Sequence, residues 1–200
     1  MKKSFLNLLV VFVFIHFLPN AFADTGGPNN ATIFTNNTSV GSSPWINTMN
    51  IQKSDGLYST VGLNEGESSQ YIQANGFGFN IPLNSTINGI VLGLQRSKTD
   101  SYADTIKDNS IKLIKGGSIV GKDKAAWSSW PSSNTYVNYG GVSDMWGTSL
   151  TPADVNDPSF GVAISALFQY GGCFGPCFGT PYPANIDHVH MTVYYTDVPV

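Results

Sequence analysis

The sequence predicts an all-β protein, an antiparallel β-sandwich of jelly-roll type with at most one short helical turn. Three observations predict it. Several short stretches alternate apolar residues with polar or small ones, which is the pattern of a strand with one buried face. Clusters of Gly, Asn, Ser and Pro separate these stretches as turns. No stretch of ten residues between them has the apolar spacing of a helix, so neither a helical bundle nor an α/β fold fits.

The first strands follow an N-terminal segment, 24–50, that is rich in Asn, Thr, Ser and Gly. We interpret this segment as an arm or a first strand. The sandwich domain is predicted over 51–200, with its first strands at 57–63, 71–81 and 87–94. The third of these is nearly continuous in apolar residues, as in a central strand that is buried on both faces.

The next elements are a hairpin and a short strand. Gly116 and Gly117 provide the positive φ angles of a tight turn, so we expect them to join strands at 111–115 and 118–120. The short strand is predicted at 136–139.

One helical turn and two strands complete the domain. Thr151 suits a helix N-cap and proline is tolerated in a first turn, which predicts a turn over 152–156. Strands are predicted at 160–168 and 189–195. In the last strand the apolar side chains claim the core, so the neighbouring histidines should face solvent or a groove.

Residues 1–23 have the pattern of a cleaved signal peptide. Lys2 and Lys3 precede an apolar run, and Ala-Phe-Ala at 21–23 fits a small-x-small cleavage motif. The apolar run is shorter than the about 20 residues of a spanning helix, so we expect no membrane span in the mature chain. The protein is therefore predicted to be bacterial and exported, either secreted or periplasmic.

The two cysteines, Cys173 and Cys177, lie close together after this leader. In an oxidising compartment two nearby thiols usually pair, so we expect a structural disulfide. Redox chemistry is the weaker alternative, because three residues separate the thiols rather than the usual two.

Charged residues make up only 12% of the chain, against about 25% in an average domain. The formal net charge is −3, and it becomes −5 without Lys2 and Lys3. This balance argues against a nucleic-acid partner. Seven of the eight remaining basic residues lie between Arg96 and Lys124. These basic residues would steer an anionic polymer or a second copy to one edge. We favour the interpretation that they belong to a solvated hairpin whose lysines prevent the sheet edge from pairing with another strand.

The second half of the chain contains a series of distinct short motifs: Asp-Asn-Ser-Ile-Lys-Leu-Ile-Lys-Gly-Gly at 108–117, Tyr-Gly-Gly at 139–141, Asp-Met-Trp-Gly-Thr-Ser-Leu-Thr at 144–151, Val-Asn at 155–156 and Phe-Gly-Val at 160–162. On these motifs, roughly 71–195 resembles a β-sandwich module of secreted bacterial and phage-like structural proteins. The resemblance implies the fold and export. It implies no activity and no ligand.

His188 and His190 are two residues apart on a predicted strand, so they project from one face, as metal-binding pairs do. A site needs a further ligand and the sequence identifies none, so the pair is a weak metal candidate. Asp100, Asp104 and Asp108 form an oxygen-rich loop that would suit calcium, without the spacing of a calcium motif. We predict no cofactor.

No catalytic motif stands out. The sequence has no G-x-S-x-G elbow, phosphate loop or dinucleotide fingerprint. The carboxylates of Glu65 and Glu67 fit a plain exposed turn. A secreted hydrolase is therefore only the third alternative.

Aromatic residues between 127 and 146 are the best functional lead. Exposed rings beside amide and hydroxyl groups suit stacking on sugar rings, whose C–H faces are apolar. We predict that the protein is a non-catalytic module that binds a glycan or a protein surface through Trp127, Trp130, Asn134, Tyr136, Asn138 and Tyr139. The competing interpretation is that these rings fill the core, as we expect for Trp146. The alternative function is a structural subunit that self-associates through the arm 24–50.

Overall fold

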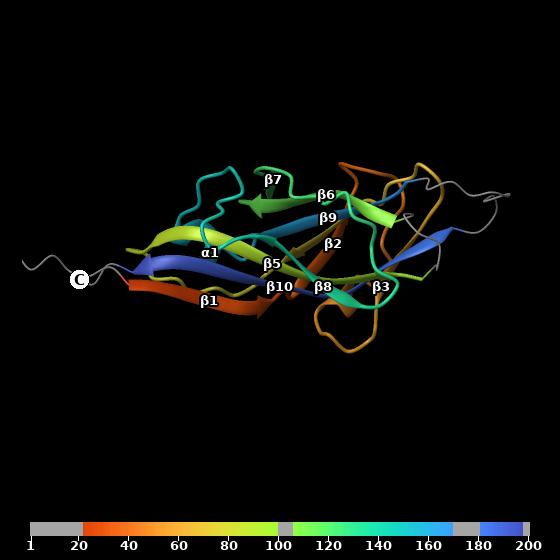
Figure 1. Cartoon of the computed structure of the whole chain (residues 1–200). Helices are drawn as coiled ribbons and strands as arrows, with labels where there is room; N and C mark the ends of the chain where they lie inside the picture. Colours follow the sequence, from red (N-terminus) through yellow and green to blue (C-terminus); the bar gives the residue numbers. More distant parts are fainter. Residues whose placement is uncertain (1–21, 100–105, 170–180, 198–200) are drawn as a thin grey trace, which may run out of the picture.

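The computed structural model describes residues 22–99, 106–169 and 181–197. Two five-stranded antiparallel sheets face each other along an elongated molecule (Figure 1). Sheet A has the order β1-β10-β5-β8, with β3 also paired to β10, and sheet B has the order β2-β4-β9-β6-β7. The strands are β1 (Phe22–Asn30), β2 (Ile33–Asn37), β3 (Ser59–Leu63), β4 (Tyr71–Asn75), β5 (Thr86–Lys98), β6 (Ile106–Lys115), β7 (Ser118–Val120), β8 (Thr135–Gly140), β9 (Gly161–Phe168) and β10 (Tyr182–Asp197).

The strand pairing confirms the predicted all-β sandwich and its jelly-roll type. From β3 onward the chain pairs like one long hairpin that has been rolled up: β3 with β10, β4 with β9, β5 with β8 and β6 with β7. Four nested antiparallel pairs divided between two sheets make a jelly roll. β1 and β2 are additional strands, because β1 pairs with β10 and β2 pairs with β4 at the sheet edges.

The N-terminal segment that the sequence left open between an arm and a strand contributes to both sheets and to the core. Ala31, Phe34 and Trp45 are all buried in the main core cluster. Asn36 fixes Trp45 through two hydrogen bonds, since its amide donates to the Trp45 carbonyl and its oxygen accepts from the Trp45 N–H. The sandwich therefore begins at β1 rather than at residue 51.

Two local predictions are confirmed. Gly116 and Gly117 form the turn between β6 and β7, both with positive φ. The helical turn is α1 (Pro152–Asn156), where the Thr151 side chain accepts from the Asp154 N–H in a capping box. A 3-10 turn, η1 (Thr48–Ile51), adds Ile51 to the core.

The predicted strand at 71–81 is too long. It ends at Asn75 because Gly76 turns the chain with a φ of +70°. Phe77, Phe79 and Ile81 beyond it are nevertheless buried. Their alternation indicates burial and not pairing in a sheet.

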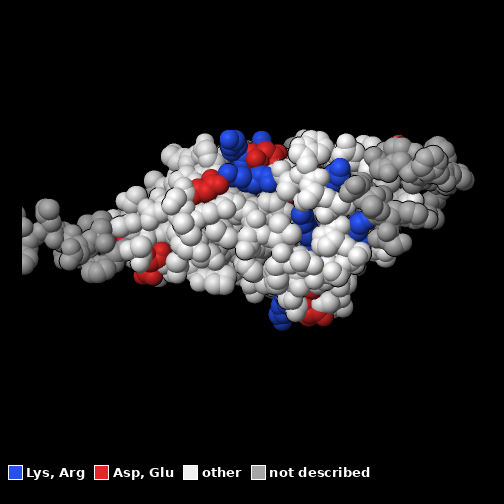
Figure 2. All heavy atoms as spheres, in the orientation of Figure 1, with Lys and Arg blue, Asp and Glu red and all other residues white. Residues whose placement is uncertain are grey.

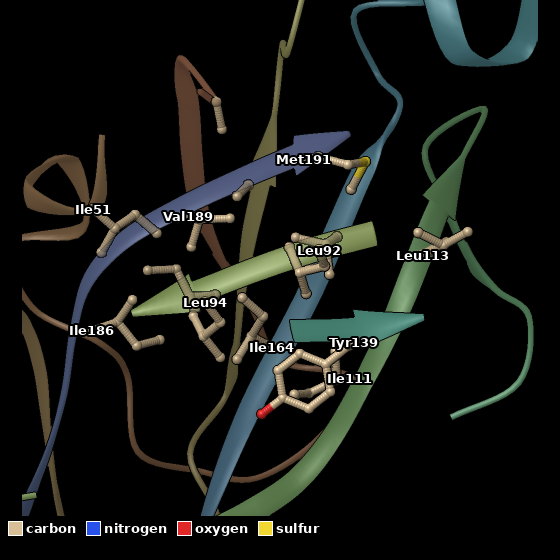
Figure 3. Packing of buried hydrophobic residues seen from close by; sticks show 14 of the residues in the cluster. Ile51, Leu92, Leu94, Ile111, Leu113, Tyr139, Ile164, Ile186, Val189 and Met191 are labelled. Carbon is tan, nitrogen blue, oxygen red and sulfur yellow. The ribbon is translucent and has the colours of Figure 1, made fainter. Parts of the chain in front are cut away.

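The core fills the space between the sheets (Figure 3). Apolar side chains of β5 and β10 point across to those of β6 and β9. Val189, Met191 and Val193 are fully buried, as their alternation predicts, and Trp146 is buried with its indole N–H donated to the Ile90 carbonyl. Charged side chains are sparse over the face of the molecule in Figure 2.

Several predictions lie outside the described residues. These are most of the leader (1–21), both cysteines (Cys173 and Cys177), and two of the three loop aspartates (Asp100 and Asp104). Within the described ranges, no helix is long and apolar enough to cross a membrane.

A buried ion pair joins the two sheets. Arg96 on β5 and Asp108 on β6 contact each other with both side chains out of solvent. The Asp108 carboxylate also accepts from the Trp130 indole N–H at 2.8 Å, from the Tyr139 hydroxyl at 2.9 Å and from the Ala126 N–H at 2.9 Å. Burial raises the pKa of Tyr139 far above its ordinary value, so the phenol stays protonated and can donate.

Aromatic rings close around this pair. The Arg96 guanidinium lies 5.0 Å from the Trp130 ring centroid and 5.6 Å from that of Tyr139. Trp45 stacks on Trp130 with the centroids 6.4 Å apart. The positive charge is therefore compensated by one carboxylate and two π faces.

Loss of Asp108 should destabilise the fold more than loss of the whole pair. Asp108→Ala leaves the Arg96 charge buried without its partner, which should lower the free energy of unfolding by about 3–5 kcal/mol. Arg96→Met combined with Asp108→Leu removes both charges and should restore most of that loss. Urea unfolding of the three proteins measures the difference. If the free energy of unfolding of Asp108→Ala lies within about 1 kcal/mol of the wild-type value, the role of the pair is contradicted.

Candidate functional site

The six residues predicted to form one binding surface point in different directions. Trp130 is only 1% exposed and Tyr139 is buried beside it. Both rings are turned inward because the Asp108 carboxylate accepts hydrogen bonds from the Trp130 indole N–H and the Tyr139 hydroxyl. The expectation that Trp130 is exposed is therefore wrong, and neither ring can stack on a ligand.

Trp127 is exposed as predicted, at 72% of its surface. It forms a wall of a pocket of about 360 Å³ on the sheet B side of the molecule. The other lining residues come from β6, from β9 and from the loop that follows β7: Asp108, Asn109, Asp123, Ala125, Ala126 and Leu167.

The loop after β7 is held against β6 by hydrogen bonds around Asp123. One carboxylate oxygen accepts from the Ile111 and Ala125 N–H groups, each at 2.9 Å, and the other accepts from the Ser110 hydroxyl at 2.5 Å. A bulge interrupts the β6 register between Asp108 and Ser110. Such an extra residue re-aims its side chain, and here it is Asn109 that lines the pocket.

The carboxylates in this pocket are already occupied. Asp108 is paired with Arg96, and Asp123 accepts three hydrogen bonds from the protein. Lys107 lies with its ammonium 6.0 Å from the Trp127 ring centroid. The pocket therefore offers an incoming molecule an indole face, an amide and a nearby positive charge, rather than a free general base.

A second group of outward-facing aromatic side chains lies on the outer face of sheet A. Tyr136 of β8 is 42% exposed and its hydroxyl is 2.6 Å from Nδ1 of His188 on β10. Nε2 of His188 is 2.9 Å from the Asn30 side-chain oxygen. Since that oxygen can only accept, Nε2 carries the proton and Nδ1 accepts from Tyr136.

His190 completes a triangle of rings with Tyr136 and His188. The ring centroids are 5.3 Å apart for His188 and His190, 5.3 Å for Tyr136 and His190, and 6.0 Å for Tyr136 and His188. We call Tyr136, His188 and His190 the sheet A triad. The sequence placed these residues in two separate predictions, a glycan site and a metal pair.

Strand register explains why the triad forms. Gln95 of β5 lies opposite His188 on one side and Tyr136 on the other. Gly93, two residues earlier, lies opposite His190, and a Cβ atom there would be 2.1 Å from His190 Nε2. Glycine at 93 therefore lets the His190 ring lie across β5 toward Tyr136.

The remaining predicted residues have different roles. Asn138 is exposed on the same face as the triad. Asn134 donates to the Asp187 carboxylate at 2.5 Å, and Asp187 also accepts from the Gly56 N–H at 3.1 Å. Asn134 thus ties two loops together.

Both histidines favour their neutral form. Burial lowers the pKa of His188, and His190 lowers it further, while Asp187 raises it. Burial also lowers the pKa of His190. Both imidazoles are therefore predominantly uncharged at neutral pH.

The stability of the protein should fall as the pH drops below about 6.5. Both imidazoles bind a proton less readily in the folded chain than in the unfolded chain, so protonation favours unfolding. The stabilisation from the two neutral imidazoles is complete above the pKa of histidine in the unfolded chain. It is lost as the pH falls through the lower pKa values of the folded chain. Urea unfolding between about pH 7 and pH 5 measures this slope. His188→Gln combined with His190→Gln should flatten it, and an unchanged slope would contradict the assignment.

No group of three or more His, Cys, Asp or Glu side chains that could hold a metal ion occurs among the described residues. Asp108, one of the candidate calcium ligands, is committed to the buried ion pair. Asp108 is therefore not available as a calcium ligand.

No protein-family model and no curated protein matches the sequence. Among solved structures, a chain of the cyanophage Pam1 capsid asymmetric unit aligns over 96% of this chain and 94% of its own length. The two are 13% identical and the TM-score is 0.30.

Proposed function

We propose that the protein is an exported, non-catalytic binding module that holds a glycan against Trp127. The observation that supports this most is the exposed indole at the wall of a pocket with polar and apolar lining, whereas most other large rings among the described residues are buried. The cleaved signal peptide over 1–23 and the Cys173–Cys177 disulfide belong to the same proposal, since both suit secretion or the periplasm.

The chemistry of the pocket suits a sugar ring. The apolar C–H face of a sugar stacks on the indole of Trp127. The Asn109 amide, whose nitrogen also donates to the Ser165 hydroxyl at 3.1 Å, offers its remaining hydrogen-bonding capacity to ring hydroxyls. A protein ligand would instead place an aliphatic or aromatic side chain on Trp127. Either ligand binds without a reaction, because the carboxylates nearby are held by internal donors.

Trp127→Ala should abolish binding to a glycan array, because it removes the stacking surface. Trp127 is mostly exposed and lies outside the core, so the variant should unfold at the same urea concentration as the wild type. Tyr136→Ala is the matched control, since it removes an exposed ring from the other sheet. Retained binding by Trp127→Ala would reject this pocket, and loss confined to Tyr136→Ala would move the site to sheet A.

Self-association is a second candidate function, and the strand order favours it. β3 to β10 form a complete set of jelly-roll pairs, whereas β1 and β2 are edge additions that precede it in the chain. An edge strand can pair with the same edge of a neighbouring copy, so that copies become linked by exchange.

A pair of cysteines tests whether β1 is exchanged. Thr25 of β1 lies opposite Tyr194 of β10. If copies exchange β1, oxidised Thr25→Cys/Tyr194→Cys should give covalent dimers and larger species on a non-reducing gel. Thr60→Cys/Asn185→Cys is the control, because these positions are opposite each other in the β3–β10 pair and should cross-link within one chain. Monomers alone from both variants would reject strand exchange.

A further inference from the structure

The sheet A triad brings two imidazoles and a phenol together on the outer face of sheet A, where Tyr136 is exposed, His190 is half-buried and His188 is buried. We propose that Tyr136, His188 and His190 bind a divalent transition-metal ion, with Cu²⁺ preferred. Two imidazole nitrogens and a phenolate oxygen are donors that Cu²⁺ and Zn²⁺ accept, and Cu²⁺ binds such sites more tightly in the usual order of divalent metals.

The distances suit chelation. Tyr136 Oη and His188 Nδ1 are 2.6 Å apart. Two ligands that each lie about 2.1 Å from one metal ion are separated by about 3 Å, so the pair needs to open by only a few tenths of an ångström. The His190 ring centroid is 5.3 Å from the centroids of both other rings. Its Nε2 lies against Gly93, so Nδ1 is the His190 nitrogen that would bind the ion.

The second nitrogen of His188 is already arranged as in metal sites. Nε2 donates to the Asn30 side-chain oxygen, so the Nδ1 lone pair faces Tyr136 and accepts its hydroxyl proton. Metal-binding histidines usually donate their other N–H in this way, and the bond fixes the ring orientation. The metal would replace the proton that Tyr136 donates to Nδ1, and that proton would leave to solvent.

Two buried side-chain oxygens near the triad have no hydrogen-bond partner among the described residues. Gln95 lies between His188 and Tyr136 in the strand register, and its Oε1 is buried without a hydrogen-bond partner among the described residues. Asn134 Oδ1, beside the Asp187 carboxylate, is also buried without a hydrogen-bond partner among the described residues. Unpaired buried oxygens are costly, and a cation nearby would lower that cost.

Titration of the tag-free protein with Cu²⁺ tests the proposal. One ion per chain should bind at the triad, and a phenolate–Cu²⁺ charge-transfer band should appear in the visible spectrum. Tyr136→Phe should remove the band while the imidazoles still bind the ion. His190→Gln should weaken binding by about tenfold or more.

Tyr194→Phe is the matched control, because Tyr194 is a partly exposed tyrosine elsewhere on β10. It should keep both the band and the affinity. Trp127→Ala should also keep them, so failure of the glycan proposal leaves this one standing. The proposal is overturned if no ion binds, if the band persists in Tyr136→Phe, or if His190→Gln binds as tightly as the wild type.

A measurement on the wild type covers the case in which His190→Gln does not fold. One equivalent of Zn²⁺ should shift the NMR signals of both imidazole rings and leave the signals of core residues such as Val189 unchanged. Zn²⁺ that shifts neither ring would contradict the site.

Discussion

A buried ion pair links the two sheets at the centre of the structure. Arg96 lies near the end of strand β5 of sheet A and Asp108 near the start of strand β6 of sheet B, so their contact joins the two sheets. Removing two charges from water is costly, and that cost is offset only when further hydrogen bonds and ring contacts surround them. Asp108 gains these from Trp130, Tyr139 and the Ala126 N–H. The loop after β7 and strand β8 are thereby held to the centre of the molecule.

The fold could be predicted because alternation and turn residues are local signals. The hairpin at Gly116 and the capped turn at Thr151 need no information from distant residues. The strands β1 and β2 were harder to recognise, because their Asn and Gly content is typical of turns and their pairing partners lie far along the chain. The stretch 77–81 shows the opposite error, since alternation there indicates burial without sheet pairing.

The site could be predicted only in part, because its geometry depends on long-range pairing. Exposure of Trp127 follows from its position in a polar loop, and the outward face of His190 follows from alternation with buried neighbours. Nothing local shows that the Trp130 indole has a buried carboxylate as its partner. The meeting of Tyr136 with the histidines requires the register of β8, β5 and β10, which a single sequence does not provide.

Strand β8 shows how the core and the surface are coupled. Tyr139 points inward to the ion pair, while Tyr136, three residues earlier, points outward to the histidines. The loop with Trp127 is anchored at the same carboxylate through the Ala126 N–H. Both exposed surfaces therefore take their positions from Asp108, although they lie on different sheets. A change at Asp108 disturbs both, whereas a change at Trp127 or Tyr136 disturbs only its own surface. The two surfaces can thus vary independently in sequence while the centre stays constant.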